Sequence, residues 1–170
     1  EYYCPEKGAV FPGGDTPEIM PDLSKHNNFM AEFLRDNPAV YHKYKNLTTK
    51  LGVTFADCIK TGVDYKGHPF IKTVGATAGD EESYTLFKDF FYPVTAARHP
   101  GYDPMTQTQP TNMDLNQLSN TDIDPEGKYV LTTRVRTGRS VRGFKLPPVI
   151  GFEERRKLES AVVEALLGMK

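Results

Sequence analysis

The residue pattern best suited to chemistry in this 170-residue chain is an alternating run near its C-terminal end. The run Tyr129–Arg136 is rich in β-branched residues and alternates in polarity, which predicts a strand. Since residues two apart share one face of a strand, we expect Thr132, Arg134 and Arg136 on one side, with the two guanidinium groups about 7 Å apart. Two arginines at this spacing can bind neighbouring phosphates through forked hydrogen bonds.

Two other interpretations of this run stay open. Exposed arginines also protect the edge of a sheet, and a basic strand can bind nucleic acid. Nucleic acid is disfavoured, because no aromatic side chain that could stack on a base lies among the arginines, and Phe144 comes only after them. The charge pattern favours an anionic partner, since residues 129–152 contain five basic side chains and no acidic one.

The other candidate groups are better explained by structure than by catalysis. Cys4 and Cys58 are the only cysteines, too few for a disulfide framework, and they form no CxxC motif. Cys58 lies on an apolar helix face and is expected to be buried. The acidic residues 80–82 suit the start of a helix, and His26 is expected to make a structural hydrogen bond. No apolar run is long enough to span a membrane, so no membrane partner is expected.

The first part of the chain is predicted to be helical. Residues 1–20 are rich in glycine and proline and are expected to form an extended lead-in. Helical patterns then occupy residues 21–104, which we interpret as a small all-α domain. The expected helices begin near Leu23 after the cap Asp22, at Pro38, after the cap Thr54, and near Gly79. The last of them reaches His99, and Pro93 is expected to kink it or to restart it.

A second domain is expected to follow a linker. Residues 100–127 contain no lysine or arginine, and small polar residues predominate, which predicts a linker over 105–128. The strand described above and an amphipathic helix at 153–167 come next. A strand, a loop and a helix cannot close a core alone. We therefore expect residues 129–170 to be the beginning of a second domain, and the chain to be part of a longer polypeptide.

Four segments of the chain match a known protein family, namely PDLSKHNNFMA (21–31), TGVDYKGHPFIKTVGATAGDEESY (61–84), YVLTTRVRTGRSVRGFKLPP (129–148) and GFEERRKLESAVVEAL (151–166). They resemble the phosphagen kinases, the ATP:guanidino phosphotransferases. The resemblance extends over nearly the whole chain after Met20, in the family's order, and within the family it is greatest to creatine kinases. It implies a small all-α N-terminal domain followed by the beginning of an α/β catalytic domain, an antiparallel sheet flanked by helices.

The resemblance implies reversible transfer of the γ-phosphoryl group of Mg-ATP to a guanidino substrate, without a tightly bound cofactor. A loop that contains Val63 would contact the guanidino group, with Val63 as an apolar wall. The family's catalytic carboxylate and reactive cysteine would lie beyond Lys170, so no catalytic residue is expected here and the fragment alone would be inactive. The residues implied to bind ATP and ADP phosphates are Thr132, Thr133, Arg134, Val135 and Arg136, with the two arginines predominant.

Creatine is the favoured substrate, while glycocyamine and taurocyamine stay open. Residues 49–57 keep the length typical of creatine and glycocyamine kinases. Residues 64–69 read DYKGHP instead of the usual DNPGHP, and residues 34–46 are about two residues longer than in typical creatine kinases. We expect a cytoplasmic homodimer or tandem kinase domains in one polypeptide. The alternative is a degenerate kinase-like module with a structural role in a larger assembly such as a flagellar axoneme.

Overall fold

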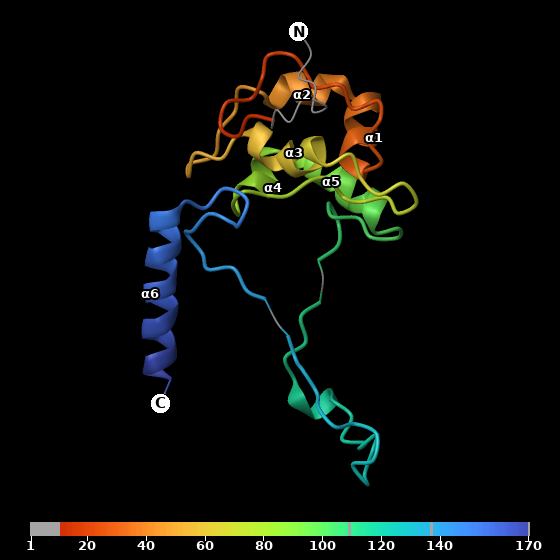
Figure 1. Cartoon of the computed structure of the whole chain (residues 1–170), viewed down its shortest axis with the longest axis vertical. Helices are drawn as coiled ribbons and strands as arrows, with labels where there is room; N and C mark the ends of the chain where they lie inside the picture. Colours follow the sequence, from red (N-terminus) through yellow and green to blue (C-terminus); the bar gives the residue numbers. More distant parts are fainter. Residues whose placement is uncertain (1–10, 109, 137, 170) are drawn as a thin grey trace.

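The computed structural model describes residues 11–108, 110–136 and 138–169. Helices α1 to α5 form one cluster, from which a long irregular segment extends before the chain returns to α6 (Figure 1). Within the described residues, no helix is long and apolar enough to cross a membrane. The elements in chain order are α1 (Phe29–Asp36), α2 (Pro38–Tyr44), α3 (Phe55–Asp64), α4 (Ser83–Leu86), α5 (Lys88–Arg98), the 3-10 helix η2 (Leu115–Gln117) and α6 (Phe152–Gly168).

The starts of α2 and α3 confirm the predictions from local sequence. Pro38 lies in the first turn of α2, where the missing N–H of proline is not needed. The Thr54 hydroxyl accepts a hydrogen bond from the Asp57 N–H at 3.3 Å. In return, the Asp57 carboxylate accepts one from the Thr54 N–H at 3.0 Å. This reciprocal capping box satisfies two backbone donors that would otherwise lack partners at the start of α3.

The first helix begins later than predicted. Asn28 caps α1, because its Oδ1 accepts a hydrogen bond from the Ala31 N–H at 2.7 Å. Asp22, the cap expected from the sequence, instead accepts a hydrogen bond from the Ser24 N–H in a local turn. The prediction of a helix from Leu23 is therefore wrong, because two side chains of similar capping ability compete and the later one has further partners in the fold.

The predicted helix over residues 79–99 consists of two helices. The break lies at Phe87, where φ is −102° and ψ is 34°, and α5 continues through Pro93 instead of ending there. The start of this region is organised by Asp80, which is 1 % exposed. Its carboxylate accepts hydrogen bonds from the Ser83 N–H at 2.8 Å, from the Ser83 hydroxyl at 2.7 Å and from the Thr49 hydroxyl. These bonds offset the cost of burying a charge and explain the acidic helix start structurally.

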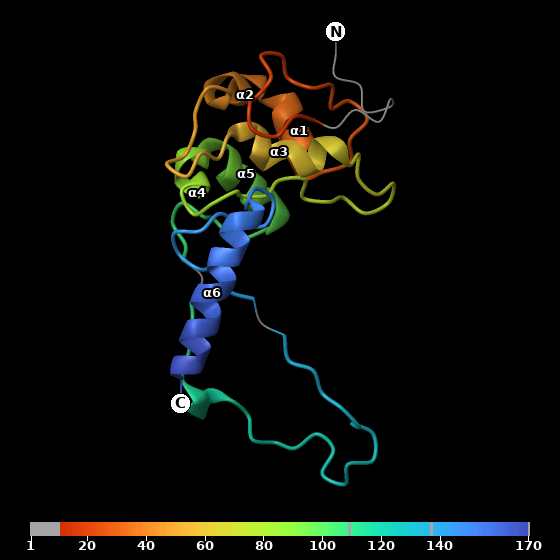
Figure 2. The ribbon, with the colours of Figure 1, turned by 60° about the vertical axis from the view of Figure 1, so that its left-hand side comes forward.

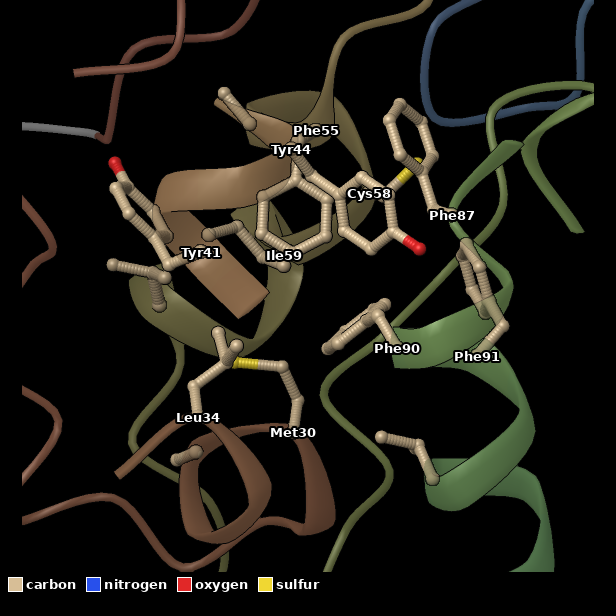
Figure 3. Packing of buried hydrophobic residues seen from close by; sticks show 14 of the residues in the cluster. Met30, Leu34, Tyr41, Tyr44, Phe55, Cys58, Ile59, Phe87, Phe90 and Phe91 are labelled. Atoms are coloured by element: carbon tan, nitrogen blue, oxygen red, sulfur yellow. The ribbon is translucent and has the colours of Figure 1, made fainter. Parts of the chain in front are cut away.

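Aromatic side chains form the centre of the helical cluster (Figure 3). Phe55 of α3 is fully buried, and its ring lies 5.0 to 5.9 Å from four other aromatic rings. The rings meet edge-on or tilted, the arrangements that their charge distribution favours. Of the apolar residues that recur at helical spacing over residues 84–94, Tyr84 is half-exposed, whereas Phe87, Phe91 and Val94 are buried. The four rings around Phe55 belong to Tyr41, Tyr44, Phe87 and Phe90.

The described part of the lead-in, residues 11–20, has no helix or strand but is fixed to the cluster. Phe11 is buried, and its N–H donates a hydrogen bond to the Asp64 carboxylate at 2.7 Å. The Tyr41 hydroxyl donates to the Pro17 carbonyl oxygen at 2.7 Å. The lead-in therefore contributes to the core, although its sequence shows no periodicity. Residues 1–10 lie outside the described residues.

The strand expected over residues 129–136 is not present as a strand, and the described residues contain no other. The segment is irregular and exposed along its whole length. Instead of pairing with a neighbouring strand, the N–H groups of Tyr129 and Val130 both donate to the Asp124 carboxylate at 2.7 Å. A strand needs the N–H and C=O groups of a neighbour. The helical half of the predicted fold class is confirmed, whereas the beginning of the α/β sheet is not.

Helix α6 confirms the helix predicted at 153–167, but none of its residues is buried. Only its N-terminal end reaches the helical cluster, as Figures 1 and 2 show. The turn before it makes the contact, since the Leu146 N–H donates to the Gly79 carbonyl oxygen at 2.7 Å. A Cβ on Gly79 would lie 2.4 Å from Val53 Cγ1 and 2.8 Å from Val149 Cγ2. This close approach requires glycine at that position.

Candidate functional site

The chain after α3 forms a loop that folds back on the start of α1. Residues 65–75, here called the 65–75 loop, contain no helix. The N–H groups of Phe29 and Met30 donate to the carbonyl oxygens of Thr73 and Val74 at 2.9 and 3.0 Å. These donors belong to the first turn of α1 and have no partner within the helix. The start of α1 therefore holds the second arm of the loop, the part that contains Thr73 and Val74 and returns toward the helical cluster.

The first arm of the loop begins at the end of α3, whose last carbonyl groups are bound by two side chains. Asn28 Nδ2 donates to the Gly62 carbonyl oxygen at 3.0 Å. His26 Nε2 donates to the Val63 carbonyl oxygen at 2.8 Å, and the imidazole is 5 % exposed. Because helix-end carbonyls lack intrahelical donors, these contacts stabilise the end of α3. The structural role that the sequence predicts for His26 is confirmed.

Asn27 lies between the two arms of the 65–75 loop and forms hydrogen bonds with residues of both arms. Its N–H donates to the Lys66 carbonyl oxygen at 2.6 Å, and its own carbonyl oxygen accepts from the Thr73 N–H at 3.4 Å. Its side-chain Nδ2 donates to the His68 carbonyl oxygen at 2.7 Å. No motif or spacing in the sequence distinguishes Asn27 from its neighbours. The only signal was its place in the KHNN segment that resembles the family.

The tip of the 65–75 loop presents apolar side chains on an organised backbone. His68 Nδ1 accepts hydrogen bonds from the N–H groups of Phe70 at 3.1 Å and Ile71 at 3.2 Å. The Phe70 side chain is 91 % exposed. Gly67 has a φ of +95°, and a Cβ there would lie 2.4 Å from the Asn27 carbonyl oxygen, so glycine is required. Exposed apolar side chains on an ordered loop are available for contact with a ligand.

Val63, predicted to form an apolar wall for a guanidino group, is part of the core. Its side chain is 1 % exposed and it lies in the last turn of α3, immediately before the 65–75 loop. In this arrangement the side chain offers no surface to a ligand, whereas its carbonyl group is held by His26. The assignment of Val63 to a substrate pocket stays a prediction.

The residues predicted to bind nucleotide phosphates lie on the irregular segment between η2 and α6, and every one of them is exposed. Both views place this segment away from the helical cluster, so the structure does not bring these residues together with Val63 (Figures 1 and 2). Their role in phosphate binding stays a prediction. The residues are Thr132, Thr133, Arg134, Val135 and Arg136.

Cys58 is a core residue, as the sequence predicts. It is fully buried, and this burial raises the pKa of its thiol to about 12. Because the thiolate is the reactive form, a thiol with this pKa is a poor nucleophile near neutral pH. The described residues also contain no group of three or more His, Cys, Asp or Glu side chains that could hold a metal ion.

We expect Cys58 to react with a thiol reagent only when the helical cluster opens. In the 170-residue chain carrying Cys4→Ser, labelling at pH 8 should be slower than in urea-unfolded chain by at least about 10²-fold. Raising the pH to 9 should accelerate labelling of the native and of the urea-unfolded chain by a similar factor of about threefold, because in both cases the reagent meets an exposed thiol with an ordinary pKa of about 8.5. Rapid labelling of the native chain at pH 8 would contradict the burial.

Comparison with known proteins identifies the family. Residues 24–96 match the family model described as the N-terminal domain of ATP:guanido phosphotransferases. The M-type creatine kinase of Rattus norvegicus is 52 % identical over 150 residues, which cover 88 % of this chain and 38 % of that protein. The chain thus spans about two fifths of the length of this relative.

Solved structures of related enzymes superpose on the chain. A lombricine kinase superposes with a TM-score of 0.76 at 32 % sequence identity. The match covers 92 % of this chain and 41 % of the lombricine kinase chain. The duplicated taurocyamine kinase of Schistosoma mansoni, solved with bound transition-state-analogue components, superposes with a TM-score of 0.70 at 32 % sequence identity. The match covers 86 % of this chain and 20 % of the taurocyamine kinase chain.

The five-helix cluster, with its loop held against the start of α1, therefore has the fold of a phosphagen kinase N-terminal domain. The chain belongs to the ATP:guanido phosphotransferase family, the phosphagen kinases.

Proposed function

We propose that the protein is a phosphagen kinase that transfers the γ-phosphoryl group of Mg-ATP reversibly to a guanidino substrate, with creatine favoured. The observation that carries the choice of creatine is the 52 % identity to the M-type creatine kinase over nearly the whole chain. The lombricine and taurocyamine kinases are each 32 % identical. Glycocyamine and taurocyamine stay as alternative substrates.

The proposed role of residues 132–136 is to bind the nucleotide phosphates. Arg134 and Arg136 are exposed and spaced two residues apart, so a strand would place them on one face. We infer that this strand forms when a neighbouring strand supplies hydrogen-bond partners. Phosphoryl transfer depends on positioning and on neutralising charge, which guanidinium groups can provide, while Mg²⁺ would arrive with the nucleotide.

The proposed role of the 65–75 loop is to contact the guanidino substrate. Its tip carries Phe70 and Ile71, which are 91 % and 66 % exposed and supply apolar contact area. Hydrogen bonds of Asn27 and His68, made within the protein itself, hold this tip. A preorganised loop binds its ligand more tightly than a mobile one, because less freedom is lost on binding.

We further propose the domain division inferred from the sequence, with a helical domain over 21–104, a linker over 105–128 and a catalytic domain that begins at 129. The family match over 24–96 supports the first of these. The duplicated taurocyamine kinase is a precedent for tandem kinase domains in one polypeptide. A homodimer and a cytoplasmic or axonemal location stay predictions.

The test is a phosphoryl-transfer assay of the full-length protein with creatine, glycocyamine, taurocyamine and lombricine. We expect transfer to creatine with a kcat/KM at least about tenfold above that for the other compounds. A higher value for another compound would retain the enzyme class but reject creatine. If ATP binds but no compound is phosphorylated, the protein is instead a degenerate kinase-like module with a structural role.

A further inference from the structure

We propose that Asn27 is a positioning residue that fixes the 65–75 loop and thereby sets the affinity for the guanidino substrate. The inference rests on the proposed function. Asn27 is half-buried and contacts both arms of the loop, through Lys66 and His68 on one side and Thr73 on the other. Asn27 therefore links the two arms directly to each other.

The side chain of Asn27 makes the contact that a substitution can remove. Its Nδ2 donates to the His68 carbonyl oxygen at 2.7 Å and reaches the Pro69 carbonyl oxygen at 3.5 Å. The other bonds of Asn27 are made by its backbone and persist in any non-proline variant. The amide group thus holds the part of the loop that immediately precedes the apolar tip.

His68 connects Asn27 to the tip of the loop through a second set of hydrogen bonds. While Asn27 holds the His68 carbonyl group, the ring Nδ1 of His68 accepts from the N–H groups of Phe70 and Ile71. The backbone of both exposed apolar residues is therefore oriented by a residue that itself depends on Asn27. Loss of the amide donor should change where Phe70 and Ile71 lie.

Asn27 and the neighbouring Asn28 differ in the partners of their side chains. Asn28 is 1 % exposed, caps α1 and bonds the end of α3, so its loss would destabilise the helical cluster. Within the part of the chain that the structure describes, the Asn27 side chain donates hydrogen bonds only to His68 and Pro69. A substitution at Asn27 should therefore alter the loop and leave the cluster folded.

The test compares Asn27→Asp with Asn37→Asp in the full-length protein. Asn37 is a matched control, because its Nδ2 also donates to a backbone carbonyl oxygen, that of Phe33, at 3.0 Å. It lies between α1 and α2, away from the loop. In Asn27→Asp the carboxylate cannot donate and faces the carbonyl oxygens of His68 and Pro69, which should displace the loop.

We expect Asn27→Asp to raise the KM for creatine about tenfold and to leave the KM for Mg-ATP within about twofold. Hydrogen exchange at the N–H groups of Phe70 and Ile71, which donate to the His68 ring, should accelerate about tenfold in this variant. Asn37→Asp should change neither measurement, and both variants should keep the thermal unfolding midpoint of the parent within a few degrees.

Equal changes in the two KM values, equal behaviour of the two variants, or faster loop exchange with an unchanged KM for creatine would each overturn the inference. A parent protein that phosphorylates no guanidino compound would overturn the proposed function instead. Exchange at Phe70 and Ile71 then decides whether Asn27 fixes the loop. Acceleration in Asn27→Asp alone supports that role, and equal exchange in both variants rejects it.

Discussion

Replacing Arg134 by alanine is expected to reduce phosphoryl transfer by the full-length protein by at least about 10²-fold. The expectation follows from the proposed binding of nucleotide phosphates by the 132–136 segment. Charge on the transferred phosphoryl group is spread over several oxygens, and a guanidinium group can donate two hydrogen bonds to them. The measurement is the initial rate of ATP formation or consumption at saturating substrate.

Arg142→Ala is the matched control for this prediction. Arg142 follows the alternating run, and its Nε lies 3.9 Å from the Glu81 carboxylate with both side chains exposed. Exposed ion pairs contribute little to stability. We therefore expect Arg142→Ala to change the rate much less than Arg134→Ala. Small and equal effects of the two substitutions would reject the phosphate-binding assignment.

Replacing Phe55 by alanine is expected to lower the free energy of unfolding of the helical cluster by about 3–5 kcal/mol. Phe55 is fully buried and contacts four aromatic rings from α2, α5 and the turn between α4 and α5. Its loss would leave a cavity among side chains that belong to different elements, which cannot all move to fill it. Because whole domains are stable by about 5–15 kcal/mol, this single change should remove a large part of the stability.

The control is Phe70→Ala, the same change at a side chain that is 91 % exposed. Its expected effect on the free energy of unfolding is below about 0.5 kcal/mol. Urea unfolding of the 170-residue chain, followed by far-ultraviolet circular dichroism, measures both variants. Similar midpoints for the two would show that the aromatic cluster is not the centre of the core.

Local sequence was sufficient wherever an element depends on residues a few positions away. Thr54 and Asp57 form a capping box within one turn, and Pro38 begins α2 by its own geometry. The burial of Cys58 followed from the apolar face of its helix. The family and the implied roles of Arg134 and its neighbours came from the order and spacing of the segments that resemble phosphagen kinases.

Tertiary contacts decided what local sequence left open. Asn28 prevails over Asp22 as the cap of α1 because its amide also binds Gly62, at the end of another helix. Residues 129–136 have the composition of a strand but no neighbouring strand within the described residues, and alternation alone supplies no hydrogen-bond partners. The role inferred for Asn27 could not be predicted from local sequence either. Its partners come from a loop that is distant in the sequence, and only the folded chain places them around it.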